Sequence, residues 1–208
     1  MVEPLHLSRP PVDPDRILRL QKYRNPERVS PVVRETARKM AALAESLVEP
    51  RGWMRRAPVS AIGPDGSVRM ADGLEFQSRS LVRLLRDAAE VVLLVLTIGT
   101  ALEQRADMMV RQEHLLEGLL LDTAGWVAID GLINDARQQL GADARRRGFR
   151  LTGRTAPGFG DWALDQQRIL FAALGDGDLS VRLTEACVML PRKSVSGVYG
   201  LIPLARPA

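Results

Sequence analysis

The sequence has little of what most catalytic and metal sites are made from. Its 208 residues include one cysteine, Cys187, and two histidines, His6 and His114. A single cysteine excludes a disulfide within the chain, and neither histidine has a second histidine or a cysteine near it in sequence, so we expect no metal site. The Gly-x-Ser-x-Gly turn of serine hydrolases is also missing, and no histidine is placed to activate a serine. We therefore expect no catalytic side chain of these kinds.

Aromatic residues and long apolar runs are scarce as well. Aromatic residues make up only 4% of the chain, so the basic patches with interleaved stacking rings that bind single-stranded nucleic acid are absent. The longest apolar run, residues 91–96, is too short to span a bilayer, and residues 1–14 lack the apolar segment of a signal peptide. These absences predict a cytoplasmic protein with no nucleic-acid partner and no membrane partner.

Lysine is rare among the basic residues. Only three of the 29 basic residues are lysine, and the formal net charge is +4. An arginine-rich surface fits an acidic partner, but a genome whose base composition favours arginine codons gives the same excess. Neither a phosphate-binding P-loop nor a dinucleotide-binding fingerprint is present.

The chain is long enough for one domain with a full hydrophobic core. Prolines in residues 1–14 predict an extended N-terminal arm, and residues 15–208 are predicted to form a single domain. Residues 15–23 fit either a short helix or a docking segment. Ser30 before Pro31 marks the start of a helix that Pro50 stops.

Apolar spacing and cap residues predict four more helices, and alternation and turn residues predict short strands. The helices are residues 78–88, 101–112 after a Thr100–Glu103 capping box, 113–146, and 162–174 capped by Asp161. The strands are residues 53–59, 67–70, 91–96, 180–184, 187–190 and 195–201. Residues 91–96 are apolar on both faces, which places them centrally in a sheet. The fold class predicted is α+β, with a long central helix and further helices packed on a bent antiparallel sheet.

Asp130 lies on the apolar face of the longest predicted helix. On a helical wheel it falls within about 40° of Leu116, as do Leu120 and Val127. An unpaired buried carboxylate costs several kcal/mol, so Asp130 requires a partner. Two interpretations remain: a carboxylate paired to an arginine or to backbone amides, or an acid that faces a ligand cavity.

The most informative stretch is Arg-Thr-Ala-Pro-Gly-Phe-Gly at 154–160, together with Ser-Val-Ser-Gly-Val-Tyr-Gly at 194–200. A turn rich in proline and glycine lets the backbone approach a ligand closely. Arg154 offers a cation for a carboxylate or phosphate, and Tyr199 is an aromatic available to close the far side. The alternatives are a surface arginine in a turn and a half-buried aromatic on a strand.

These two segments, with Leu-Thr-Glu at 183–185 and Met-Leu-Pro at 189–191, resemble the activation domain of cobalamin-dependent methionine synthase, most closely in its stand-alone form. The resemblance is specific over residues 150–203 and weaker from about residue 16. It implies a methionine synthase activation domain-like fold that binds S-adenosylmethionine. It also implies two partners, a protein that carries cobalamin and a flavodoxin-type or other flavoprotein electron donor. The nucleophile in that chemistry is the cobalt, which agrees with the lack of catalytic side chains.

The resemblance also implies a set of binding residues. Arg154 matches the arginine that pairs with the methionine carboxylate, and Tyr199 matches an aromatic that contacts the ligand. Asp130 falls where the family has an acid facing the amino or sulfonium end, but the family more often has glutamate there. Phe159 stands where the family usually has tyrosine, so a hydroxyl contact is lost. The other implied positions are Ala156, Pro157, Gly158, Ser196 and Gly197.

The function expected is that of a stand-alone reactivation subunit in methionine biosynthesis. Such a subunit would support reductive remethylation of cob(II)alamin on a methionine synthase, and would count as a methyltransferase subunit. One alternative is a reactivation partner of another corrinoid methyltransferase. Another is a module that binds S-adenosylmethionine or a corrinoid protein without catalysis.

Overall fold

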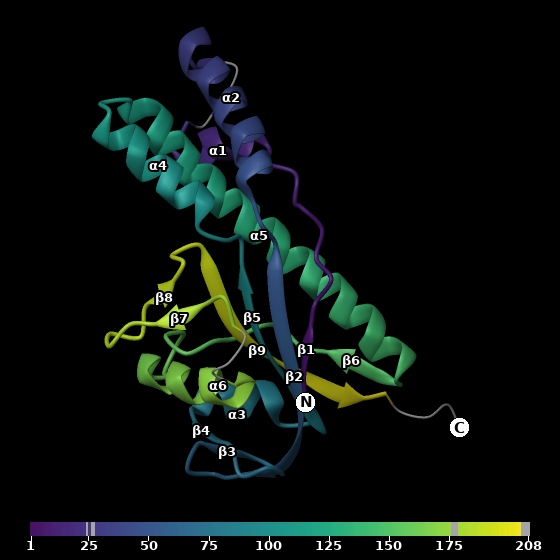
Figure 1. Cartoon of the computed structure of the whole chain (residues 1–208). Coiled ribbons are helices and arrows are strands. Elements are labelled where there is room, and N and C mark those ends of the chain that lie inside the picture. Colours follow the sequence, from purple (N-terminus) through teal and green to yellow (C-terminus); the bar gives the residue numbers. More distant parts are fainter. Residues whose placement is uncertain (24, 26–27, 176–178, 205–208) are drawn as a thin grey trace.

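The computed structural model describes residues 1–23, 25, 28–175 and 179–204. Its centre is an antiparallel sheet crossed by one long helix (Figure 1). The strand order is β4-β3-β2-β5-β9-β6, with β1 paired to β2. These strands are β1 Val2–Pro4, β2 Arg51–Ile62, β3 Ser67–Met70, β4 Glu75–Gln77, β5 Glu90–Thr97, β6 Phe149–Leu151 and β9 Ser194–Pro203. A separate ribbon pairs β7 Arg182–Leu183 with β8 Met189–Leu190.

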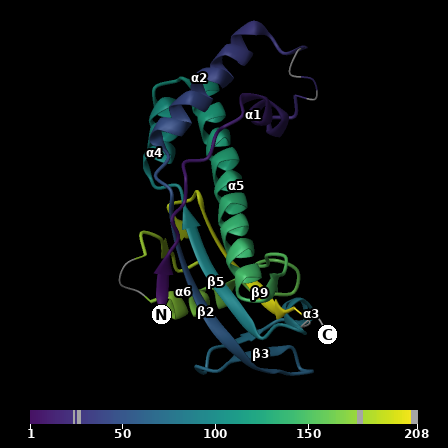
Figure 2. The ribbon, with the colours of Figure 1, turned by 90° about the vertical axis from the view of Figure 1, so that its right-hand side faces the viewer.

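The helices lie on both faces of the sheet. They are α1 Pro14–Leu20, α2 Pro31–Leu47, α3 Arg79–Leu85, α4 Ala101–Arg111, α5 Leu115–Arg146 and α6 Gln167–Leu174, with a 3₁₀ turn at Leu164–Gln166. Helix α5 runs along one face and continues past the sheet to α1, α2 and α4 (Figure 2). Helices α3 and α6 cover the opposite face. Strand β2 shifts register between Val59 and Ala61, an irregularity that bends strands. The predicted α+β class is confirmed.

Strand β5 lies between the two hydrophobic cores and contributes side chains to both. Val92, Leu94 and Leu96 pack in the core under α5, whereas Val91 and Leu93 pack in the core under α3 and α6. The strand lies between β2 and β9. Its apolar run on both faces therefore predicted its central position correctly, because each face of the strand meets helices.

Ser30 caps α2 as predicted, but two other predicted caps are wrong. Thr100 makes no side-chain cap hydrogen bond, and the Glu103 carboxylate, the other half of the predicted capping box, accepts from the Arg192 N–H at 2.8 Å. Asp161 does not cap the helix that follows it. Its carboxylate accepts from the N–H groups of Arg79 at 2.8 Å and Ser80 at 3.0 Å, and so caps α3. The helix after the loop begins only at Gln167, beyond the 3₁₀ turn.

The N-terminal residues are extended and lie along the domain. After β1, the Leu5 N–H donates to the Gly52 carbonyl at 2.8 Å, and the Ser8 N–H donates to Asp135 on α5 at 2.9 Å. The segment 15–23 was predicted to be a short helix or a docking segment, and its residues 15–20 belong to α1, which begins at Pro14. In the ranges that the structure describes, no helix combines the length and hydrophobicity that crossing a membrane requires.

Candidate functional site

A cavity of about 350 Å³ opens where the 154–160 loop, the segment leading into β9, and α5 meet. Its walls are mostly apolar, with a few polar groups, as ligand sites usually are. The lining residues are Trp126, Arg154, Ala156, Pro157, Phe159, Leu164, Gln167, Cys187, Val188, Met189, Arg192, Ser194, Val195 and Ser196. Of the positions predicted from sequence, Arg154, Ala156, Pro157, Phe159 and Ser196 therefore line one cavity.

Arg154 is held against the edge of β9. The neighbouring Thr155 exchanges two backbone hydrogen bonds with Val198, at 3.1 and 2.8 Å. The Arg154 side chain then crosses Gly197, and its Nη1 donates to the Ser196 carbonyl at 2.6 Å. No ion pair joins Arg154 to any residue that the structure describes, so most of its N–H donors are available for an anion.

The loop keeps its shape through glycines and one buried tryptophan. Gly158 and Gly160 have φ values of +93° and +61°, in the region that favours glycine. The Gly158 N–H donates to the carbonyl of Trp162, whose ring is buried and packs edge-on against Phe76 at 5.1 Å. The Asp161 cap fastens the same turn to α3. Hydrogen bonds from Ser80, and then from Arg79 and Ser78, hold the pKa of Asp161 well below its usual range.

Phe159 stands at the lip of the cavity. Its ring is 60% exposed, and the Arg154 guanidinium carbon lies 5.9 Å from the ring centroid. This distance is within the range of a cation–π contact. Phenylalanine at this position thus still supports the arginine, although it offers no hydroxyl to a ligand.

The polar groups on the cavity floor bind one another. The Ser196 hydroxyl donates to Gln167 Oε1 at 3.0 Å, and Gln167 Nε2 donates to the Cys187 carbonyl at 2.9 Å. Ser196 and Gln167 are both buried. The Ser196 hydroxyl is therefore a structural hydrogen-bonding group, and its geometry gives no sign of a nucleophile.

Sequence reasoning missed Trp126, which forms the α5 side of the cavity. It is 49% exposed, an unusual exposure for tryptophan that only the structure reveals. The Lys193 ammonium lies 4.3 Å from the centroid of this ring and 2.8 Å from the Asp122 carboxylate. Because the Lys193 side chain is only 4% exposed, Trp126 rests on a fixed support.

A second arginine at the cavity, Arg192, is already paired. Its Nη2 donates to both Asp107 oxygens, at 2.8 and 2.9 Å, and Glu103 accepts from its backbone. The hydrogen bond to Asp107 raises the pKa of Arg192 above its ordinary value. Its charge is compensated within the fold, whereas Arg154 has no acidic partner among the residues described.

Four positions predicted to bind the ligand do not line the cavity: Gly158, Gly197, Asp130 and Tyr199. Asp130 pairs with Arg16 of α1 at 2.7 Å, and its side chain is 47% exposed. The predicted partner exists, but the expectation that Asp130 is buried is wrong, because α1 covers this side of α5 only in part.

Tyr199 lies in the core beneath α5, with 1% of its surface exposed. Alternation along β9 turns it, like Gly197, toward α5, where helix side chains cover the ring. Burial raises the pKa of Tyr199, and the charges of Arg154 and Arg137 partly oppose this shift. Tyr199 therefore packs behind the arginine rather than in the cavity wall.

Nothing in the described ranges forms a metal site, since no three histidine, cysteine, aspartate or glutamate side chains group together there. The fold is an α+β domain with a mostly apolar cavity, and a loop beside the sheet places Arg154 at that cavity.

The particular fold is that of the reactivation domain of MetH. A crystal structure of the MetH reactivation domain bound to AdoHcy matches with a TM-score of 0.65 over 100% of this chain and 80% of that chain. The two sequences are 16% identical, so the match establishes the fold and leaves the site to be argued from this chain's residues. No protein-family model matches the sequence, and neither does any curated protein.

Proposed function

We propose that this chain binds S-adenosylmethionine in the Arg154 cavity and supports reductive remethylation of cob(II)alamin on a separate, cobalamin-dependent methionine synthase. The observation that carries the proposal is the guanidinium of Arg154, which forms no ion pair with any described residue and lies across Gly197 at a mostly apolar cavity. Support for the ligand class comes from the solved domain of the same fold, which was crystallised with AdoHcy.

The cavity groups match the parts of this ligand. The Arg154 fork pairs with the methionine carboxylate, a charge-assisted contact that favours arginine over lysine. The ring of Trp126, together with Val188 and Met189, offers an apolar surface to the adenine. With Asp130 paired to Arg16, the sulfonium is left to the aromatic rings at the cavity, since π faces attract cations.

The protein's part in the reaction is positioning. S-adenosylmethionine supplies the methyl group, and the cobalamin held by the partner accepts it after a flavodoxin-type or other flavoprotein donor has provided one electron. Fixing one reactant in the correct orientation can lower the barrier by several kcal/mol without any acid, base or nucleophile from the chain. The cavity accordingly contains an anchor for the ligand and satisfied polar groups around it.

The test is transfer of labelled methyl. The purified chain is mixed with a cobalamin-loaded methionine synthase that lacks its own activation domain, a reductant and methyl-labelled S-adenosylmethionine. The proposal predicts label on the cobalamin that depends on the chain and is lost with Arg154→Ala. Arg146→Ala, which removes an exposed arginine paired to Asp143 elsewhere, serves as the matched control. Absence of transfer despite binding of S-adenosylmethionine would contradict the catalytic part of the proposal.

The same assay separates the two alternatives. Transfer to another corrinoid protein, and none to methionine synthase, would indicate a reactivation partner of a different methyltransferase. Binding without transfer to either acceptor would indicate a non-catalytic module. Phe159 offers no hydroxyl at the lip of the cavity, and this missing polar contact is the observation that favours the non-catalytic alternative.

A further inference from the structure

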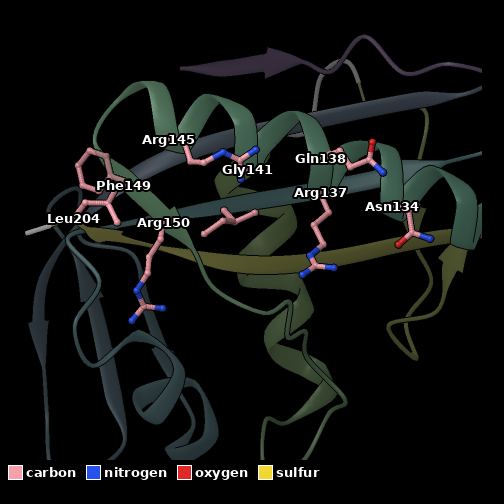
Figure 3. A pocket seen from close by; sticks show the side chains of 9 residues that line it. Asn134, Arg137, Gln138, Gly141, Arg145, Phe149, Arg150 and Leu204 are labelled. Atoms are coloured by element: carbon pink, nitrogen blue, oxygen red, sulfur yellow. The ribbon is translucent and has the colours of Figure 1, made fainter.

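A second, larger hollow lies along the C-terminal half of α5, away from the Arg154 cavity. It has a volume of about 590 Å³ and shares no lining residue with that cavity. We call it the α5–β6 groove, since its walls are α5 and strand β6, with Leu204 at one end (Figure 3). Ligand sites typically have volumes of this size.

Three arginines stand around the α5–β6 groove. Arg137 and Arg145 come from α5 and Arg150 comes from β6, and the heads of Arg137 and Arg150 extend in the same direction (Figure 3). No side chain of the three makes a hydrogen bond or ion pair with another residue in the described part of the chain. Unpaired arginines gathered at one hollow repel each other and gain from any anion that enters.

The carboxylates close to this groove already form ion pairs with arginines that do not line it. Asp143 accepts from Arg56 at 2.9 Å and from Arg146 at 3.2 Å. Glu90 accepts from Arg147 at 2.8 Å. The acidic side chains of this end of the molecule therefore neutralise arginines outside the groove, and the groove itself keeps its positive charge.

The remaining walls indicate what kind of anion fits. The amide side chains of Asn134 and Gln138 add neutral donors beside Arg137 (Figure 3). Phe149 and Leu151 are half-buried and give the opposite end an apolar surface. Guanidinium forks match the geometry of phosphate oxygens, and an apolar surface beside them suits an attached organic group.

We propose that the α5–β6 groove binds an organic phosphate of about the size of a nucleoside diphosphate. The phosphates contact Arg137 and Arg145, and the organic group lies toward Phe149. This site is separate from the one proposed for S-adenosylmethionine, and each of the two proposals can be correct without the other.

Calorimetric titration of ADP into the whole chain at low salt tests the proposal. We expect saturable binding that Arg137→Gln and Arg145→Gln each weaken about tenfold or more, the effect of losing one charge-assisted contact. Arg146→Gln is the matched control, since it removes the same charge from the next position of the same helix but outside the groove. It should change ADP affinity less than about twofold.

Further arms exclude other sources of binding. Pyrophosphate should compete with ADP, adenosine should not, and Arg154→Ala should leave ADP affinity unchanged because Arg154 does not line the α5–β6 groove. The arginines are exposed, so the variants should unfold at the wild-type temperature. Lack of saturable ADP binding at millimolar concentration, an equal loss with Arg146→Gln, or displacement of ADP by adenosine would overturn the proposal. Binding of an oligonucleotide by a chain that does not bind ADP would also overturn the proposal.

Discussion

Replacing Gly197 by alanine tests whether the position of Arg154 depends on the bare backbone of β9. An added Cβ would lie 2.8 Å from both Cγ and Cδ of Arg154 and 3.2 Å from its Nη1. Ordinary carbon contacts are about 3.5–4.0 Å, so the side chain must move by roughly 1 Å. The hydrogen bond to the Ser196 carbonyl, now 2.6 Å long, would then be lost.

The expected effect on binding is large and the expected effect on folding is small. Loss of a charge-assisted contact costs about 1.5–3 kcal/mol, or roughly 10–150-fold in affinity for S-adenosylmethionine. Overpacking costs about 1–3 kcal/mol, and alanine in a strand regains about 0.5–1 kcal/mol over glycine. Because the flexible Arg154 side chain can move away from the added methyl group while the backbone stays in place, we expect a net loss of stability of roughly 0–2 kcal/mol.

Calorimetric titration and thermal unfolding measure the two effects separately. The matched control is Gly153→Ala, one residue before Arg154, where an added Cβ would meet nothing within 4 Å. We expect it to bind S-adenosylmethionine like the wild type. Wild-type affinity in Gly197→Ala, or an equal loss in the control, would refute the assigned position of Arg154.

Three further predictions concern the surroundings of the cavity. Trp126→Ala should weaken binding of S-adenosylmethionine by about 1–3 kcal/mol, because the ring supplies packing surface. Trp126→Phe should retain most of the affinity, and an equal loss of affinity in both variants would contradict that role. Lys193→Met should lower the free energy of unfolding by about 1–3 kcal/mol, as a denaturant titration would show, since it leaves Asp122 without its charged partner. Asp161→Asn should destabilise the protein at neutral pH. The folded-state pKa of Asp161 is lowered, so its contribution is complete above the usual aspartate pKa and fades as pH falls below it. The difference in unfolding midpoint between the wild type and Asp161→Asn should therefore narrow in acid. The control is Asp165→Asn, at an exposed position, which should unfold at the same midpoint as the wild type.

Much of the fold was predictable because local signals and burial agree along the main elements. The six-residue apolar run of β5 and the periodicity of α5 each require a core on the faces that the structure buries. The 154–160 loop was predictable for a similar reason. Its glycines adopt the positive φ values that only glycine accepts readily.

The errors concern residues whose partners are distant in sequence. A helical wheel gives the direction of Asp130 but not the 114-residue separation from Arg16, which pairs with it. Likewise, Asp161 has the sequence context of a cap, yet the first turn of α3, some 80 residues earlier, takes its carboxylate. Trp126 was overlooked because its exposure depends on how α4 and the start of β9 leave one side of α5 open, and no local pattern records this.

The central claim is that Arg154 anchors S-adenosylmethionine, and one calorimetric comparison tests it most directly. The ligand is titrated into the wild type, Arg154→Lys, Arg154→Ala and the Arg146→Ala control, alone and with the cobalamin-loaded partner. If Arg154 anchors the ligand, the wild type binds it, Arg154→Ala weakens binding by about 1.5–3 kcal/mol, Arg154→Lys lies between them, and the control binds like the wild type. A wild type that fails to bind in both conditions, or an Arg154→Ala variant that binds as tightly as the wild type, would contradict it.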